Sequence, residues 1–337
     1  MAGLAGYTCP STAPTAGTRN TIEHCLGKCP HPCVSPPLLA AIYSAERANH
    51  HKGAYLSASM LSGGGCRKQT WYERFNDFYE VPKRRYWPFR GTLAHRIVED
   101  AGALVTPHGW MQELRMAVPL VFDGYPQPIF DANEDFTGDF DDTQSLTIML
   151  GGTTDAYNPF MRRLDDYKTM ADAKVDMVLR GTKGGTFSKN IDDAWVWQLN
   201  IYRWLIAHTP ITTKHRAAWK QHGLAKVPGK YLPAPESLHI QAIGMMEIPL
   251  TGSSYLPQRA KQPFDIDPIP VLPLDQIEAF IREQAIDWYR YLVLREEPPV
   301  LPKAEQWKCG SCPFNGDVLP GQPCSPKTAA QPLVHLT

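Results

Sequence analysis

The chain lacks several features that would assign it to a class at once. It contains no run of 18 apolar residues, which argues against a membrane-spanning helix. No charged segment followed by an apolar one opens it, so secretion is not indicated and we expect an intracellular protein. It also shows no internal repeat and no helicase motif, which favours a stand-alone protein or one subunit of a complex.

An excess of either charge is also missing. Lys+Arg and Asp+Glu both number 34, whereas nucleic-acid binders usually carry a positive excess. Local basic patches can still contact phosphates, and three runs are candidates, although each taken alone is more typical of a solvated face: Lys83-Arg84-Arg85, Arg162-Arg163 and Lys214-His215-Arg216. With 337 residues, 43% of them hydrophobic, the chain is long enough for one large domain or two modest ones.

Cysteine, by contrast, is plentiful. Eight cysteines in an intracellular protein indicate metal or redox centres more than disulfides. One group of four comprises Cys66 and, much later in the chain, Cys309, Cys312 and Cys324. The two-residue spacing between Cys309 and Cys312 allows both thiolates to bind one ion or cluster.

The second group of cysteines lies in the first 35 residues, which are rich in Pro, Gly and Thr. It consists of Cys9, Cys25, Cys29 and Cys33, with His24 and His31 interleaved. A segment this short cannot bury a core and would order readily around a zinc ion. The sequence therefore predicts an appended N-terminal arm over residues 1–35 with a candidate zinc site, and a flexible tail with incidental cysteines is the alternative.

The residue pattern predicts both strands and helices, as in an α/β fold. Residues 111–169 have the alternation of a strand meander, whereas residues 91–103 and 194–207 have helical patterns. The helix over 194–207 carries three tryptophans, which we expect in the core. Residues 208–236 are basic and punctuated by prolines, which indicates an excursion from that core.

The stretch from Gly152 to Lys168 carries the most chemical information. One strand end delivers Asp155, and a second strand delivers Asp166 and Lys168, which face the same side because they are two residues apart. Two carboxylates can hold Mg²⁺ or Mn²⁺ through oxygen ligands, and a neighbouring lysine can orient or deprotonate a water and offset charge on a phosphate. These residues suit metal-assisted phosphodiester hydrolysis, although Asp-x-Lys alone is more often a solvated strand edge.

Further residues occur around this stretch in a fixed order. Glu113 lies in an alternating strand upstream of it. The complete set of short elements is Gly91-x-x-x-His95, Gly152-x-x-Asp155, Asp166-Tyr167-Lys168-Thr169 and Gln198-x-x-x-Tyr202. Together they resemble the RecB-like branch of the PD-(D/E)xK nuclease superfamily, most closely the CRISPR-associated RecB-like exonucleases, the AddB nuclease domain and related phage nucleases. The resemblance covers about residues 55–325.

This resemblance implies a fold, a site and an activity. It implies an α/β fold with a restriction-endonuclease-like core, a mixed central sheet flanked by helices, within residues 36–325, followed by a tail over 326–337. The implied metal ligands are His95, Asp155, Asp166 and the backbone carbonyl of Tyr167. Lys168 would assist the water, and Gln198 and Tyr202 would contact DNA or the lysine.

The implied activity is that of a metal-dependent DNA nuclease, most simply an exonuclease, in recombination, repair or phage DNA processing. Its partners would be DNA and other recombination or replication proteins, in the cytoplasm of a bacterium or a phage-infected cell. A non-catalytic DNA-binding protein and an iron–sulfur redox sensor are the alternatives.

The resemblance also gives the first cysteine group a role. In the similar nucleases, one cysteine before the catalytic core and three after it hold a four-iron four-sulfur cluster that joins the ends of the domain. Cys66, Cys309, Cys312 and Cys324 match that arrangement, although the gap between Cys312 and Cys324 is longer than usual. We rank a cluster before zinc, and zinc before inert thiols.

Overall fold

The computed structural model describes most of the chain and divides it into two compact units. The described residues are 4–9, 17–30, 32–47, 55–76, 78–80, 82–131, 136–171, 185–187, 191–245, 264–266, 269–303, 305–306, 309, 312–315 and 324. Unit 1 comprises residues 1–51, 65–90 and 290–337, and unit 2 comprises residues 52–64 and 91–289. His31, the side chains of Lys83, Arg84 and Arg85, and the expected tail over 326–337 lie outside the described residues.

Unit 1 is built on a small three-stranded sheet. Strand β1 (Leu4–Thr8) lies in the middle, antiparallel to β2 (Arg19–Thr21) and parallel to β4 (Phe78–Glu80). The unit also contains helices α1 (Ile22–Gly27), α2 (Pro36–Arg47) and α4 (Arg67–Phe75). The predicted arm over residues 1–35 is therefore not a separate appendage, because its first strand pairs with β4.

An aromatic and thiol cluster forms part of the core of unit 1. Phe314 stacks on Tyr72 of α4, with ring centroids 5.1 Å apart, and also packs against Phe78 of β4. Cys312 and Cys324 are buried in the same cluster. Burying these rings and thiols together joins the early and late segments of this unit, which are more than 200 residues apart in sequence.

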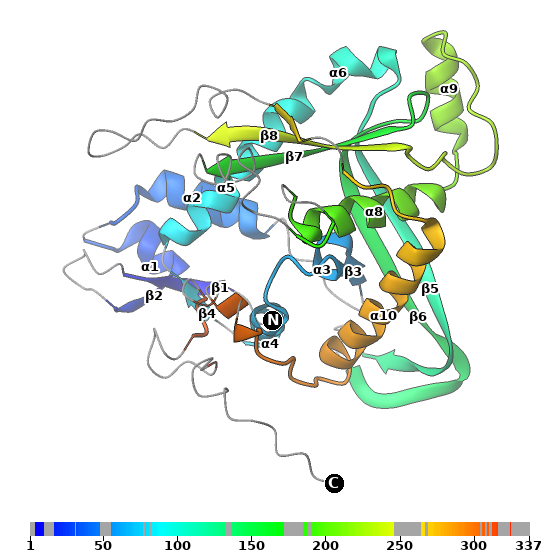
Figure 1. Cartoon of the computed structure of the whole chain (residues 1–337). Coiled ribbons are helices and arrows are strands. Elements are labelled where there is room, and N and C mark those ends of the chain that lie inside the picture. The colour runs from blue at the N-terminus through cyan, green and yellow to red at the C-terminus, as the bar shows by residue number, and fades with distance from the viewer. Residues whose placement is uncertain are drawn as a thin grey trace. The chain divides into compact units, whose positions relative to one another are not determined.

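Unit 2 contains a mixed six-stranded sheet (Figure 1). Its strands are β3 (Tyr55–Ser57), β5 (Met111–Phe130), β6 (Phe136–Asn158), β7 (Arg163–Ala171), β8 (Ser237–Met245) and β9 (Phe264–Ile266). Strand β6 pairs with β5 along most of its length, and it also pairs with β3 in parallel and with β7 in the antiparallel direction. Strands β7 and β8 are parallel, whereas β8 and β9 are antiparallel.

Helix α8 (Asp193–Ala207) packs on β5, β6 and β7 (Figure 1). Asp192 caps its start by accepting a hydrogen bond from the amide of Ala194. Two of its expected core tryptophans, Trp195 and Trp204, are buried, and Trp197 stacks on Phe280 with ring centroids 3.7 Å apart. The predicted α/β class with a mixed sheet and flanking helices is thus confirmed.

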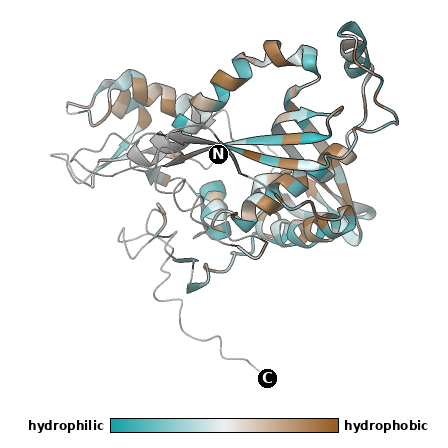
Figure 2. Cartoon of the chain, turned by 45° about the horizontal axis from the view of Figure 1, so that its top comes forward, coloured by the Kyte–Doolittle hydropathy of each residue, from teal (hydrophilic) through white to brown (hydrophobic). Residues whose placement is uncertain are grey.

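The remaining helices complete the described fold. They are α3 (Ala58–Leu61), α5 (Pro82–Asp100), α6 (Gly102–Val105), the 3-10 helix η1 (Thr106–His108), α9 (Thr213–Gln221) and α10 (Leu274–Leu292). Hydrophobic and hydrophilic residues alternate along the paired strands of unit 2, as expected for half-buried sheets (Figure 2). None of the helices in the described part of the chain combines the length and apolar character that crossing a bilayer requires.

Candidate active site

Strands β6 and β7 diverge where the two predicted carboxylates lie. Their ladder begins at Asn158↔Arg163 and ends at Ala156↔Asp165. Immediately beyond it, the Asp155 side chain continues the connection, because its Oδ2 accepts a hydrogen bond from the backbone amide of Tyr167 at 2.6 Å. The strand pairing therefore places Asp155 next to the Asp166–Lys168 segment, as the sequence predicts.

Helix α5 supplies the predicted histidine; it begins at Pro82, nine residues before the predicted start at Gly91, so Gly91 and His95 both lie within it. His95 Nδ1 lies 3.2 Å from Asp155 Oδ1. The hydrogen bond to Asp155 raises the pKa of His95, against the opposing effect of burial. Gly91 itself lies against β7, because a Cβ added to it would be only 3.2 Å from Oγ1 of Thr169. The small residue lets α5 approach the strand that carries Asp166.

The predicted lysine is held by a chain of three side chains. Lys168 Nζ lies 2.8 Å from Asp166 Oδ2 and donates to Gln198 Oε1 at 3.1 Å. Gln198 Nε2 in turn donates to the hydroxyl of Tyr202 at 3.2 Å. Of the two predicted contacts of Gln198, the structure shows the one with the lysine, and Tyr202 acts through Gln198.

Asp166 is the most deeply buried carboxylate of the site. Its side chain is 5% exposed, and burial raises its pKa, while Lys168 opposes that rise. Its Oδ2 has the ammonium group of Lys168 as its partner, 2.8 Å away. A buried carboxylate oxygen in this state retains the capacity to bind a cation.

Gly152 has a packing role that explains its place in the motif. A Cβ added at this position would lie 2.6 Å from Cε1 of the Tyr202 ring, closer than any real contact allows. The glycine thus lets the Tyr202 ring lie directly on β6. Gly152 and Tyr202, which belong to different sequence motifs, therefore pack directly against each other.

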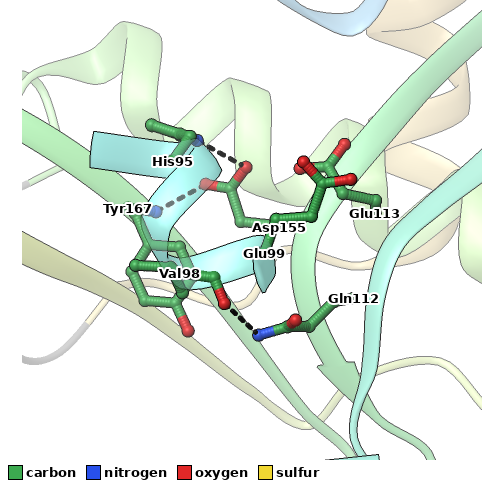
Figure 3. Close-up of a pocket in the computed structure, with 7 residues that line it drawn as sticks. All are labelled: His95, Val98, Glu99, Gln112, Glu113, Asp155 and Tyr167. Atoms are coloured by element: carbon green, nitrogen blue, oxygen red, sulfur yellow. Dashed lines mark hydrogen bonds and ion pairs between the residues drawn. The ribbon is translucent and has the colours of Figure 1, made fainter. Parts of the chain in front are cut away.

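A small hollow opens beside Asp155 (Figure 3). The carboxylates of Glu99 of α5 and Glu113 of β5 lie next to each other beside Asp155, whose own carboxylate points toward His95 and the Tyr167 amide (Figure 3). Burial is the main cause that raises the pKa of Glu113, and the negative charges of Asp155 and Glu99 raise it further. The hollow is lined by His95, Val98, Glu99, Gln112, Glu113, Asp155 and Tyr167.

Two of these carboxylates have no assigned role in the sequence-based prediction. Glu99 is four residues after His95, so the helical repeat places both on one face, where Glu99 alone would be no more than a solvated neighbour of the histidine. Glu113 is less accessible to sequence reasoning, because its φ of 48° lies in the left-handed region that an alternating strand pattern does not anticipate. It lies between the pairs Gln112↔Ala156 and Leu114↔Thr154, and thus across from Asp155.

The donors of the site are at present engaged with one another. Across the described part of the chain, no three His, Cys, Asp or Glu side chains are gathered closely enough to hold a metal ion as they stand. At Asp155 and Asp166, His95 and Lys168 take the positions beside the carboxylate oxygens. The donor set, two carboxylates with one imidazole, is nevertheless of the type that suits Mg²⁺ or Mn²⁺.

The first cysteine group converges in unit 1. The Cys312 amide donates to the Cys309 carbonyl, and Cys324 donates through its amide to Phe314. Burial is the main cause that raises the pKa of Cys312 to about 12, and the nearby thiols of Cys66, Cys324 and Cys309 raise it further. Cys66 caps α4, where its Sγ accepts a hydrogen bond from the amide of Gln69.

The second cysteine group also converges in unit 1. Cys9 follows β1, Cys25 lies on α1, and Cys29 and Cys33 follow that helix. Burial is the main cause that raises the pKa of Cys25 to about 11, and the nearby Cys29, Cys33 and Cys9 raise it further. Among the described residues, no three of these thiols are close enough together to hold a metal ion. None of the eight cysteines, all of them described, forms a disulfide.

Comparison with known proteins gives no assignment. No protein-family model matches the chain, and no curated protein matches it. One similar solved structure is the crystal structure of a protein called SSO0001. The similarity has a TM-score of 0.42 and 13% sequence identity, and it covers 86% of this chain and 98% of that one.

Proposed function

We propose that this protein is a metal-dependent DNA nuclease that hydrolyses phosphodiester bonds. The observation that supports the proposal best is the convergence of Asp155, Asp166 and Lys168 at the diverging ends of β6 and β7. Glu99, Glu113 and His95 border the same hollow. Such a carboxylate-rich site with one half-buried lysine matches the needs of metal-assisted phosphoryl transfer to water.

Each side chain has a role in this proposal. Asp155, Asp166, His95 and the Tyr167 carbonyl would hold Mg²⁺ or Mn²⁺, which supplies a water of lowered pKa and stabilises charge on the phosphate. Lys168 orients the attacking water or offsets the charge of the transition state. Gln198 and Tyr202 are positioning residues, because they hold the ammonium group of Lys168 rather than the reacting atoms.

The proposal assigns structural roles to both cysteine groups. Cys66, Cys309, Cys312 and Cys324 would hold a four-iron four-sulfur cluster, or zinc in its place. The raised thiol pKa of Cys312 indicates that a bound cation would be needed to keep that sulfur ionised near neutral pH. Cys9, Cys25, Cys29 and Cys33 would hold a separate zinc ion.

Digestion of end-labelled DNA tests the proposal. Single- and double-stranded substrates are incubated with the full chain in magnesium, in manganese or in chelator. We expect cleavage only with the divalent ion. The Asp166→Asn variant should lose cleavage, whereas Asp165→Asn should retain it, because Asp165 pairs with Arg163 through two hydrogen bonds outside the site.

Two results would contradict the proposal. One is an absence of cleavage on every DNA substrate with either ion. The other is equal cleavage by wild type and Asp166→Asn protein of matched thermal stability. A coloured protein that contains iron and binds DNA without cutting it would instead support the redox-sensor alternative.

A further inference from the structure

The zero net charge of the chain conceals two oppositely charged stretches in unit 2. Residues 194–235 contain no Asp or Glu but six Lys and Arg: Arg203, Lys214, Arg216, Lys220, Lys226 and Lys230. Residues 116–161 contain no Lys, Arg or His but eight Asp and Glu: Asp123, Asp131, Glu134, Asp135, Asp139, Asp141, Asp142 and Asp155. A polyanion that approaches unit 2 therefore meets very different potentials at these two places.

The basic stretch contains both structural cations and exposed ones. Arg203 donates to the carbonyls of Pro235 and Leu272, and Arg216 donates to those of Val227 and Gly229. These two guanidinium groups hold loops in place. The four remaining cations are exposed lysines without a carboxylate partner in the described residues: Lys214, Lys220, Lys226 and Lys230.

These lysines belong to a small structure closed upon itself, which we call the α9 excursion, residues 209–232. Its ends meet through the amide of Ile211, which donates to the Lys230 carbonyl, and the amide of Leu232, which donates to Thr209. Helix α9 begins at a capping box made by Thr212 and His215. The lysines are thus held on an ordered element, and most of α9 is hydrophilic (Figure 2).

An exposed aromatic ring accompanies the lysines. Tyr231 follows Lys230 and is 53% exposed, although its backbone forms a bridge with Pro210. Cations combined with exposed aromatic rings are the usual equipment for binding a single nucleic-acid strand, through phosphates and stacked bases respectively. A solvated lysine face alone would not require an exposed aromatic ring.

The α9 excursion lies at the same end of β6 as Asp155. Trp219 of α9 packs on Phe160, with ring centroids 5.4 Å apart, and Phe160 belongs to the turn between β6 and β7. Strand β6 ends at Asn158, three residues after Asp155, which corresponds to about 10 Å along the strand. The α9 excursion therefore lies beyond the end of the strand that carries Asp155.

We propose that the α9 excursion binds the backbone of the DNA strand outside the phosphodiester that is cut, through Lys214, Lys220, Lys226 and Lys230. This inference rests on the proposed nuclease function. It adds a direction to the substrate: the strand runs from Asp155 along the β6–β7 turn toward α9. The acidic stretch over residues 116–161 would repel a DNA strand that ran in the other direction.

Equilibrium DNA binding by the full chain in chelator tests the inference without cleavage. The probe is a fluorescently labelled single strand, and affinity is measured as a function of salt. Each lost phosphate contact reduces the slope of log K against log[salt] by about 0.7–0.9. We therefore expect the four-lysine alanine variant to bind with a slope shallower by about 3, independent of DNA sequence. The corresponding four-lysine arginine variant should retain the wild-type slope.

A matched pair of double variants controls for general loss of charge. Lys214→Ala/Lys220→Ala removes two charges from α9, and Lys28→Ala/Lys303→Ala removes two exposed lysines from unit 1. Only the first pair should weaken binding, and thermal melting checks that all variants fold. Equal slopes for wild type and the four-lysine alanine variant, equal losses for the two double variants, or no DNA binding by wild type would each overturn the inference. Failure of metal-dependent cleavage in wild type would instead remove the proposed function.

Discussion

Each unit contains a lysine–carboxylate pair with nearly the same N–O distance, but the two carboxylates differ in burial and in the direction of their pKa shift. Lys168 lies 2.8 Å from Asp166 in unit 2, and Lys68 lies 2.7 Å from Glu297 in unit 1. The Asp166 side chain is 5% exposed and its pKa is raised, chiefly by burial. The Glu297 side chain is 47% exposed and its pKa is lowered by hydrogen bonds from Lys68 and Tyr72.

The comparison shows that the two pairs differ in the burial of the carboxylate rather than in the distance between the charged groups. A well-solvated carboxylate gains from its cation and loses little, so the pair contributes modest stability. A buried carboxylate loses hydration that one ammonium group does not fully replace, so it retains affinity for a further cation. We infer that the unit 2 pair serves chemistry and the unit 1 pair serves folding.

The largest expected effect comes from breaking the two pairs in parallel. Lys168→Ala should lower metal-dependent cleavage by about 10³-fold or more, since a positioned proton-transfer group and a transition-state cation are lost together. Lys68→Ala should leave the rate per folded molecule unchanged. Single-turnover cleavage of labelled DNA measures both. A Lys168→Ala protein that cleaves at the wild-type rate would remove the distinction between the two pairs.

A second large effect concerns the thiols of unit 1. Cys312→Ser should destabilise the protein by about 3 kcal/mol or more and remove one bound metal centre, because a metal centre contributes folding free energy directly. Cys25→Ser should remove zinc without loss of the iron–sulfur absorbance. Metal analysis of anaerobically purified protein, together with thermal melting, separates the two cysteine groups. Identical metal content in wild type and both variants would mean that the thiols hold no metal.

An intermediate effect is expected at the contact between Gly152 and Tyr202. Gly152→Ala forces a Cβ against the Tyr202 ring and should destabilise the protein by about 1–3 kcal/mol. It should also reduce the cleavage rate more than DNA affinity, because the Gln198–Lys168 hydrogen bond depends on that ring position. Gly65→Ala is the control, since a Cβ there meets nothing within 4 Å. Wild-type behaviour of Gly152→Ala would show that the ring moves without consequence.

The smallest expected effect concerns the contribution of Glu297 in unit 1 to the stability of the protein. Glu297→Gln should cost about 1 kcal/mol of stability at neutral pH, because the hydrogen bonds persist in part and solvent screens the charge. Since its pKa is lowered on folding, the carboxylate stabilises the protein above its ordinary pKa and ceases to do so as pH falls through the lowered value. Melting curves of wild type and Glu297→Gln should therefore converge in acid. A constant difference between them at all pH values would contradict this role.

The sequence predicts the candidate site better than it predicts the organisation around it. Asp155, Asp166 and Lys168 follow from strand periodicity, and Gln198 and Tyr202 follow from helical spacing, so the structure brings them together as expected. The left-handed backbone of Glu113 and the pairing of β1 with β4 depend on tertiary packing. No local residue pattern encodes either, and the arm therefore looked separable when read as a sequence.

The backbone amide proton of Tyr167 donates to Asp155, so its exchange rate and chemical shift report on the position of the Asp155 carboxylate. Its acceptor is a side chain rather than a ladder carbonyl, so its exchange with solvent deuterium depends on where the Asp155 carboxylate points. Asp155→Asn retains an acceptor oxygen and should keep the proton protected, whereas Asp155→Ala should expose it while the amides of Tyr157 and Leu164 stay slow. A cation that draws the carboxylate away would shift the resonance of this amide before any product forms.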